Sequence, residues 1–213
     1  MIPFPMYLLL SLGWASDHSH DITDVFTWVT EQEGRSKLAV VMTVHPFAST
    51  EATFSPNYNY EFSLRRAQID GIADHTHISY GAAFLISCHL TQDLQHLRCR
   101  LAPVGKHCRD CTRVITTSLN DSQGSEEPGV RLFAGLRGDP FFIDTTQAIP
   151  RSVPRTDHDA VKHSAPIKGD VLAIALELDV LDLFGEETLY GVSGQISTRA
   201  TLTEVPRVGR LKK

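Results

Sequence analysis

The chain has 213 residues, of which 42% are hydrophobic, so it can bury one substantial core and its length favours one domain over two. Its formal net charge is -5 at pH 7, whereas a nucleic-acid-binding protein normally carries a dominant basic face, so nucleic acid is not an expected partner. Two basic stretches (98–113 and 199–213) and one acidic stretch (170–187) are interpreted as solvated faces, with a charged docking surface as the alternative.

Residues 1–15 form an uncharged, apolar stretch that ends in the small-x-small pattern Gly13-Trp14-Ala15. Signal peptidase cuts after such a pattern, so we expect a periplasmic or extracellular protein whose single domain spans 16–213. The stretch has no basic residue before its apolar run and is too short to cross a bilayer of about 30 Å. If it is retained, we expect it to contact a membrane interface or a membrane-protein partner through Phe4, Tyr7, Leu8, Leu9, Leu10 and Trp14.

The predicted secondary structure consists of short strands rich in β-branched and aromatic residues. Residues 21–30 favour a strand over a helix capped by Thr23, because β-branched side chains are stiff in helices. Residues 120–129 and 145–169 have loop composition. An all-β fold follows, an antiparallel β-sandwich with long loops and few short helices. Its other strands are expected at 37–44, 58–64, 78–88, 97–101, 112–119, 171–178 and 189–203.

Two of the four cysteines fall on a predicted hairpin. Apolar residues alternate with polar or small ones on both of its strands, and a turn centred on Asp93-Leu94 places Cys88 directly opposite Cys99. Both side chains then point to the apolar face, where antiparallel partners lie close enough to bridge. The sequence therefore predicts a disulfide between Cys88 and Cys99.

The other two cysteines, Cys108 and Cys111, have C-x-x-C spacing. A structural disulfide is the favoured interpretation, and a thiol-exchange site or half of a zinc site are the alternatives. A redox enzyme places this motif at the start of a helix, whereas the residues that follow, 112–119, predict a strand.

The segment 131–144, RLFAGLRGDPFFID, combines residues of unusual backbone freedom with large apolar ones. It predicts a structural corner made of strand, tight loop and strand. Asp139 is expected to pair with Arg131 or Arg137 across this corner, and a catalytic carboxylate pair with Asp144 is the less favoured alternative. The corner residues are Arg131, Gly135, Arg137, Gly138, Asp139, Pro140, Phe141 and Phe142.

Several of the ten histidines lie in aspartate-flanked groups. An H-x-H pair on a strand projects both rings to one face, which suits zinc or copper, but surface histidines are the favoured interpretation and no other cofactor is expected. If the mature chain begins at Ser16, its amine, two backbone nitrogens and the His18 imidazole offer a square-planar set for Cu(II) or Ni(II). The candidate ligands are Asp17, His18, His20, His75 and His77, with a further group at His158 and His163.

Five segments in fixed order carry a family resemblance: SDHSHDITDVFTW, LAVVMTVHPFA, TFSPNYNYEFSL, RLFAGLRGDPFFID and GDVLAIALELDVLDLF. Together they resemble the bacterial domain-of-unknown-function family 4331 over most of residues 16–210, and FAGLRGDPFF is the most specific part. The resemblance implies an exported, β-rich protein without an established activity and supplies no catalytic residues. Longer members continue where this chain stops, near 205–210, so we expect an exposed surface or sheet edge that a partner or a second copy covers.

The chain has no G-x-S-x-G, H-E-x-x-H or phosphate-loop motif, and nothing in it predicts catalysis. We therefore expect a non-enzymatic accessory subunit that binds a protein partner at the periplasmic face of a membrane or membrane-protein complex. A soluble periplasmic metal-binding protein and a thiol-redox protein are the alternatives. Co-purification with membranes, stoichiometric bound metal and a readily reduced Cys108–Cys111 pair would separate them.

Overall fold

The computed structural model describes residues 18–32, 34–70, 77–104, 112–139, 169–185 and 190–199. Several sequence predictions therefore lie outside the described residues. These concern residues 1–17, the C-x-x-C pair Cys108 and Cys111, the ligands His75, His158 and His163, and the corner residues Pro140, Phe141 and Phe142.

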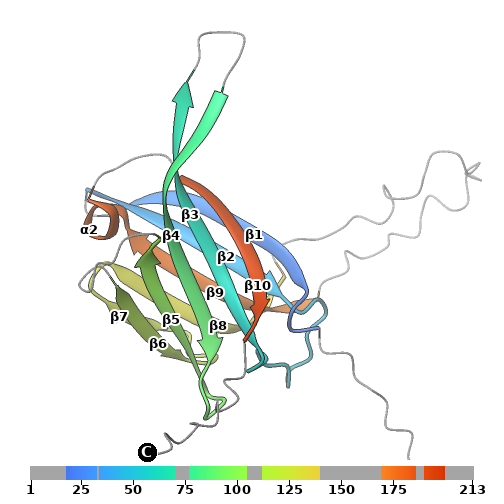
Figure 1. Cartoon of the computed structure of the whole chain (residues 1–213). Helices are drawn as coiled ribbons and strands as arrows, with labels where there is room; N and C mark the ends of the chain where they lie inside the picture. Colours follow the sequence, from blue (N-terminus) through green and yellow to red (C-terminus); the bar gives the residue numbers. More distant parts are fainter. Residues whose placement is uncertain are drawn as a thin grey trace, which may run out of the picture.

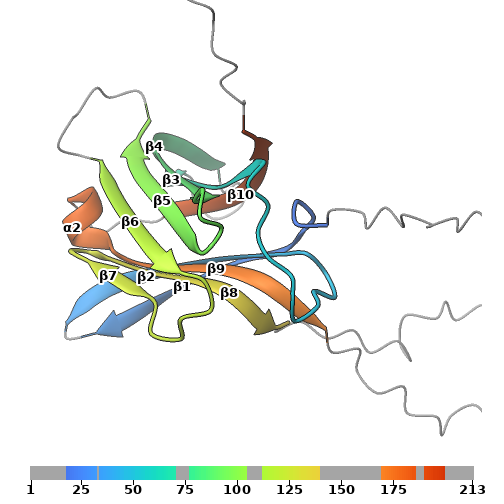
Figure 2. The same cartoon turned by 90° about the horizontal axis from the view of Figure 1, so that it is seen from below.

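Two five-stranded antiparallel sheets pack face to face (Figures 1 and 2). The first sheet has the order β1 (Ile22–Gln32), β2 (Arg35–Val44), β9 (Asp170–Asp179), β8 (Val130–Gly138) and β7 (Ser125–Glu127). The second has the order β10 (Tyr190–Thr198), β3 (Tyr58–Asp70), β4 (His77–Leu90), β5 (His96–Pro103) and β6 (Arg113–Ser118). The short helix α2 (Val180–Phe184) follows β9. The predicted all-β sandwich is confirmed, as is the strand rather than the helix over residues 21–30.

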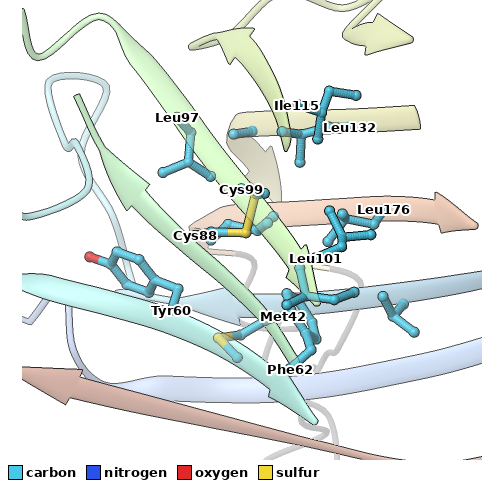
Figure 3. Packing of buried hydrophobic residues seen from close by; sticks show 14 of the residues in the cluster. Met42, Tyr60, Phe62, Cys88, Leu97, Cys99, Leu101, Ile115, Leu132 and Leu176 are labelled. Carbon is cyan, nitrogen blue, oxygen red and sulfur yellow. A yellow bond between two sulfur atoms is a disulfide. The ribbon is translucent and has the colours of Figure 1, made fainter. Parts of the chain in front are cut away.

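The core lies between the two sheets, where alternate residues of each strand turn inward (Figure 3). Tyr60 is the largest side chain that is fully buried, and its hydroxyl accepts a hydrogen bond of 3.0 Å from the Ser55 amide, so its polar end is satisfied. The first sheet contributes Leu38, Val40, Met42, Val44, Val130, Leu132, Ala134, Leu172, Ile174, Leu176 and Leu178. The second contributes Tyr60, Phe62, Leu64, Ile86, Cys88, Leu90, Leu97, Cys99, Leu101 and Ile115.

The predicted cysteine hairpin is confirmed. Cys88 on β4 and Cys99 on β5 are register partners and form a disulfide inside the core (Figure 3). The turn between the strands contains Leu94 at φ 58°, and Thr91 and Asp93 hydrogen-bond each other at 2.6 Å within it. The alternation of the two strands fixed the facing of both cysteines, because a slip of one residue would turn them outward.

Strands β3 and β4 run beyond the sandwich. The pairing of β3 with β10 ends at Arg66 and that of β4 with β5 begins at Phe84, so the outer parts of β3 and β4 pair only with each other within the described chain. This two-stranded arm projects from the sandwich in Figure 1, and Ile78 and Tyr80 are exposed on it. The strand predicted at 58–64 is too short, since β3 continues to Asp70. Its outer part is held by backbone pairing with β4, which does not require a buried face.

The tight loop predicted within residues 131–144 does not include Gly135 or the residues up to Gly138. Gly135 lies inside β8 and pairs with Ala173 on β9. A Cβ there would lie 2.8 Å from the Asn120 nitrogen, and Asn120 closes against the strand with bonds to Ala134 O (2.9 Å) and from the Leu136 amide (2.7 Å). Glycine is therefore needed for close approach rather than for a turn. The predicted 120–129 loop also contains one short strand, β7, and the last strand ends at Thr198 rather than at residue 203.

We expect Gly135→Ala to lower the free energy of unfolding by about 2 kcal/mol, because the added methyl group meets the Asn120 backbone and because residues with a side chain rarely adopt the φ of 157° found at Gly135. Gly138→Ala is the matched control, since a Cβ at this position of the same strand meets nothing within 4 Å. Urea unfolding of both variants measures the difference. Equal stability of the two variants would contradict the close-approach explanation.

Candidate functional site

A central band of the outer face of the first sheet is apolar. Strand β2 is apolar without a break over residues 38–42, and β9 over residues 171–176. The residues that alternate with their core positions point away from the second sheet. Antiparallel sheets in a sandwich usually present a solvated outer face, so apolar side chains there need a separate explanation. The outward apolar residues of these two strands are Ala39, Val41, Val171, Ala173 and Ala175, and the outward polar residues at the ends of the band are Lys37, Thr43, Glu177 and Asp179.

Strand register aligns four apolar side chains across this face. Phe26 on β1 pairs with Val41 on β2, Val41 pairs with Ala175 on β9, and Ala175 pairs with Phe133 on β8. We call these four residues the outer row. Trp28 lies two residues beyond Phe26 on the same face, and 49% of its surface is exposed. Small side chains thus occupy the middle of the sheet, between aromatic side chains on β1 and β8.

Charged groups border the outer row. The Arg137 guanidinium lies 3.8 Å from the centroid of the Phe133 ring, a cation–π contact, and Arg131 Nε lies 3.9 Å from Glu126 Oε2. Pairing of either arginine with Asp139 stays a prediction. Burial and the neighbouring Asp139 carboxylate raise the pKa of Asp24, which lies on β1 beside the row. The border is therefore polar and of mixed charge.

The second sheet contrasts with the first. Its outward side chains are mostly polar, and they hydrogen-bond one another: Gln195 Nε2 donates to Glu61 Oε2 at 2.8 Å and Ser87 Oγ to Glu61 Oε1 at 3.3 Å. Burial, Arg199 and Arg98 lower the pKa of His89 on this face. Among the described residues, the outer face of the second sheet is thus more polar than that of the first. Outward residues of the second sheet include Asn59, Glu61, Ser87, His89, Arg98, Arg100, Thr116 and Gln195.

The predicted metal ligands are brought together only in part. His18 Nδ1 lies 2.7 Å from Asp21 Oδ2, and His20 Nε2 lies 3.6 Å from Asp21 Oδ1, so one carboxylate orients both rings. Within the residues that the structure describes, no group of three or more histidine, cysteine or acidic side chains could hold a metal ion. His77 lies on β4, and Asp17 and His75 are outside the described residues.

Sequence reasoning missed a buried charge cluster. The Asp179 carboxylate, 1% exposed at the end of β9, accepts hydrogen bonds from Lys37 Nζ at 2.9 Å and from Arg35 Nη1 at 3.3 Å, both at the start of β2. Its other oxygen accepts from the Asp182 amide at 3.1 Å and caps α2. Lys37 and Asp179 are 142 positions apart, so no local pattern could connect them.

The comparisons with known proteins identify no relative: no family model, no curated protein and no solved structure matches the chain. Among the described residues there is no helix with the length and apolar character needed to cross a membrane. The Cys88–Cys99 disulfide is compatible with an oxidising compartment.

Proposed function

We propose that this protein is a non-enzymatic accessory subunit that binds a protein partner through the outer face of its first sheet. The observation that carries the proposal is the outer row, Phe26–Val41–Ala175–Phe133, where a sandwich would ordinarily present polar side chains. Contiguous apolar surface with a polar border is typical of a protein–protein interaction site. Aromatic and arginine side chains, here Trp28 and Arg137, are also enriched where interfaces gain most of their affinity.

The partner element that fits this face is a helix with one apolar side. Strands lie about 4.8 Å apart, so the aromatic side chains of β1 and β8 are separated by about 14 Å across β2 and β9. A helix with its side chains is about 10–12 Å wide. The small side chains Ala39, Ala173 and Ala175 between them allow such a helix to approach the sheet closely.

The compartment is proposed to be the periplasm or the outside of the cell. A buried disulfide and the apolar residues 1–15 support export, and the resemblance of five ordered segments to family 4331 implies the same compartment. In such a compartment the partner would be a subunit of a membrane or membrane-protein complex. The metal-binding and thiol-redox alternatives stay predictions, because Cys108, Cys111 and His75 lie outside the described residues.

A photo-cross-linking experiment in the native host tests the proposal. A photoreactive phenylalanine analogue replaces Phe133 in one strain and the exposed Thr116, on the outer face of the second sheet, in another. We expect a discrete cross-linked product at Phe133 and none at Thr116. Mass spectrometry of the product should place the attached residues of the partner at helical spacing of three or four.

Cross-linking of equal yield at both positions, or none at Phe133, would overturn the proposed docking surface. Attachment to an extended segment would retain the surface but contradict the helical partner. Phe133 lies on β8, three strands from β1, so the result does not depend on what contacts the β1 edge.

A further inference from the structure

Strand β1 forms a long and unprotected edge of the first sheet. It spans eleven residues, and in the described part of the chain it pairs with β2 alone. Large apolar side chains concentrate on it, with exposed fractions of 37% for Val25, 49% for Trp28 and 60% for Val29. Among the described strands, none pairs with the backbone groups along its outer side, which another strand can therefore use.

Natural sheet edges normally carry features that prevent such pairing, including short length, lysine, proline or a bulge. Strand β1 has no proline, glycine or lysine, and its one irregularity lies at its beginning, between Ile22 and Asp24. The other edges differ: β7 has three residues, β6 has six, and β10 contains Gly191 and Gly194, which weaken a strand. Among the strands at the two ends of each described sheet, β1 is thus the one best suited to intermolecular pairing.

We propose that a second copy of this chain pairs with β1, antiparallel and centred on Thr27, so that the two first sheets join into one. A two-fold axis at Thr27 places Phe26 opposite Trp28 of the second copy, and Val25 opposite Val29. Aromatic and β-branched pairs of this kind are favourable across strands. This inference goes beyond the proposed function, because it concerns association of the chain with itself.

Charge and facing select this register over its neighbours. With the axis at Thr27, Asp24 lies opposite Thr30 and Thr23 opposite Glu31, so no like charges meet. Moving the axis to Trp28 would place Val25 opposite Glu31. Moving the axis to a point between two residues would pair outward side chains with inward ones, because facing alternates along a strand.

The consequence is a continuous outer face across both copies. After the irregularity at the start of β1, residues of even number, including Phe26 and Trp28, face outward in each copy, so the two outer rows meet at the axis. The exposed Val25 and Val29, which face the second sheet, pack against each other across the same seam.

Engineered disulfide formation tests the register. Residues directly opposite each other in antiparallel strands have Cβ atoms about 4.5–5.5 Å apart, within reach of a disulfide. In the full chain with Cys108→Ser and Cys111→Ser, we expect Thr27→Cys to give a covalent dimer in a non-reducing intact mass spectrum. The matched control Thr30→Cys lies on the same edge opposite Asp24 and should give no covalent dimer.

Native mass measurement of the unmodified full chain supplies the second readout. We expect a dimer at micromolar concentration and a monomer for Val29→Lys, which places a charge at the seam, with circular dichroism showing that the variant is folded. A monomeric wild-type chain, or equal cross-linking by Thr27→Cys and Thr30→Cys, would overturn the inference. Either result would leave the cross-linking test at Phe133 unaffected, so the two proposals can fail separately.

Discussion

Replacing Cys88 and Cys99 together with alanine is expected to lower the free energy of unfolding by about 3 kcal/mol. The disulfide closes a loop with a sequence separation of 11, and removing such a constraint from the unfolded chain accounts for most of that value. Both residues are fully buried between Tyr60 and Ile115 in one row of the second sheet, so the lost sulfur atoms also leave unfilled volume.

Equilibrium unfolding in urea, without reductant, measures this change. Thr116→Ala serves as the control, because Thr116 is exposed on the same sheet and its replacement should change the free energy by less than about 0.5 kcal/mol. A loss below about 1 kcal/mol for the double variant would show that the hairpin holds without its covalent bond.

Replacing Asp179 with asparagine is expected to cost about 2 kcal/mol at neutral pH. The carboxylate is buried and accepts charge-assisted hydrogen bonds from Lys37 and Arg35, each worth more than a neutral bond. Both basic side chains retain some exposure and can reach water when the charge is removed, which keeps the loss below that of a fully buried ion pair.

Because of Asp179, we also expect the free energy of unfolding to depend on pH. Burial raises the pKa of Asp179, but hydrogen bonds from Lys37, the Asp182 amide and Arg35 outweigh it and bring the pKa from 3.8 to about 2. Between these two values the unfolded chain binds more protons than the folded one, so stability rises with pH. The contribution of Asp179 is complete above about pH 4 and is lost as the pH falls towards 2.

Urea unfolding from pH 2 to pH 7 checks this expectation, with Asp93→Asn as the matched control. The Thr91 hydroxyl, the Gln95 amide and His96 also lower the pKa of Asp93 to about 2, but that carboxylate is exposed in the β4–β5 turn. We expect Asp179→Asn to reduce the rise of the free energy of unfolding between pH 2 and pH 4 and to lower this free energy at pH 7. Asp93→Asn should have smaller effects of the same kind. Identical curves for Asp179→Asn and the wild-type protein would contradict the role of the buried cluster.

The elements predicted well are those specified by local pattern. Alternation between residues 78 and 101, together with a turn at Asp93-Leu94, gave the register of β4 and β5 and hence the Cys88–Cys99 disulfide. The period of a strand is two, so a correct turn assigns the facing of every residue in a hairpin. Residues of β1 were likewise assigned to a strand from their β-branched content alone.

Predictions failed where a residue is explained by a distant contact. The residues around Gly135 have the composition of a turn, but glycine is needed there because a side chain would collide with Asn120. Asn120 lies too far away in the sequence for a local pattern to connect the two residues. Asp179 similarly looks like one of several acids in a solvated stretch, whereas the sheet order places it beside Arg35 and Lys37. These contacts exist only once β2, β8 and β9 are neighbours.

The sequence by itself determined the β class, the cysteine hairpin and the apolar character of β2 and β9, because strand periodicity and residue chemistry are local properties. The tertiary structure alone decided which of those apolar residues form the core and which form the outer row, since an unbroken apolar run does not reveal its two faces. It also decided that β1 is an edge. Sheet order depends on contacts between strands far apart in the chain, and those contacts place Phe26, Val41, Ala175 and Phe133 on one surface.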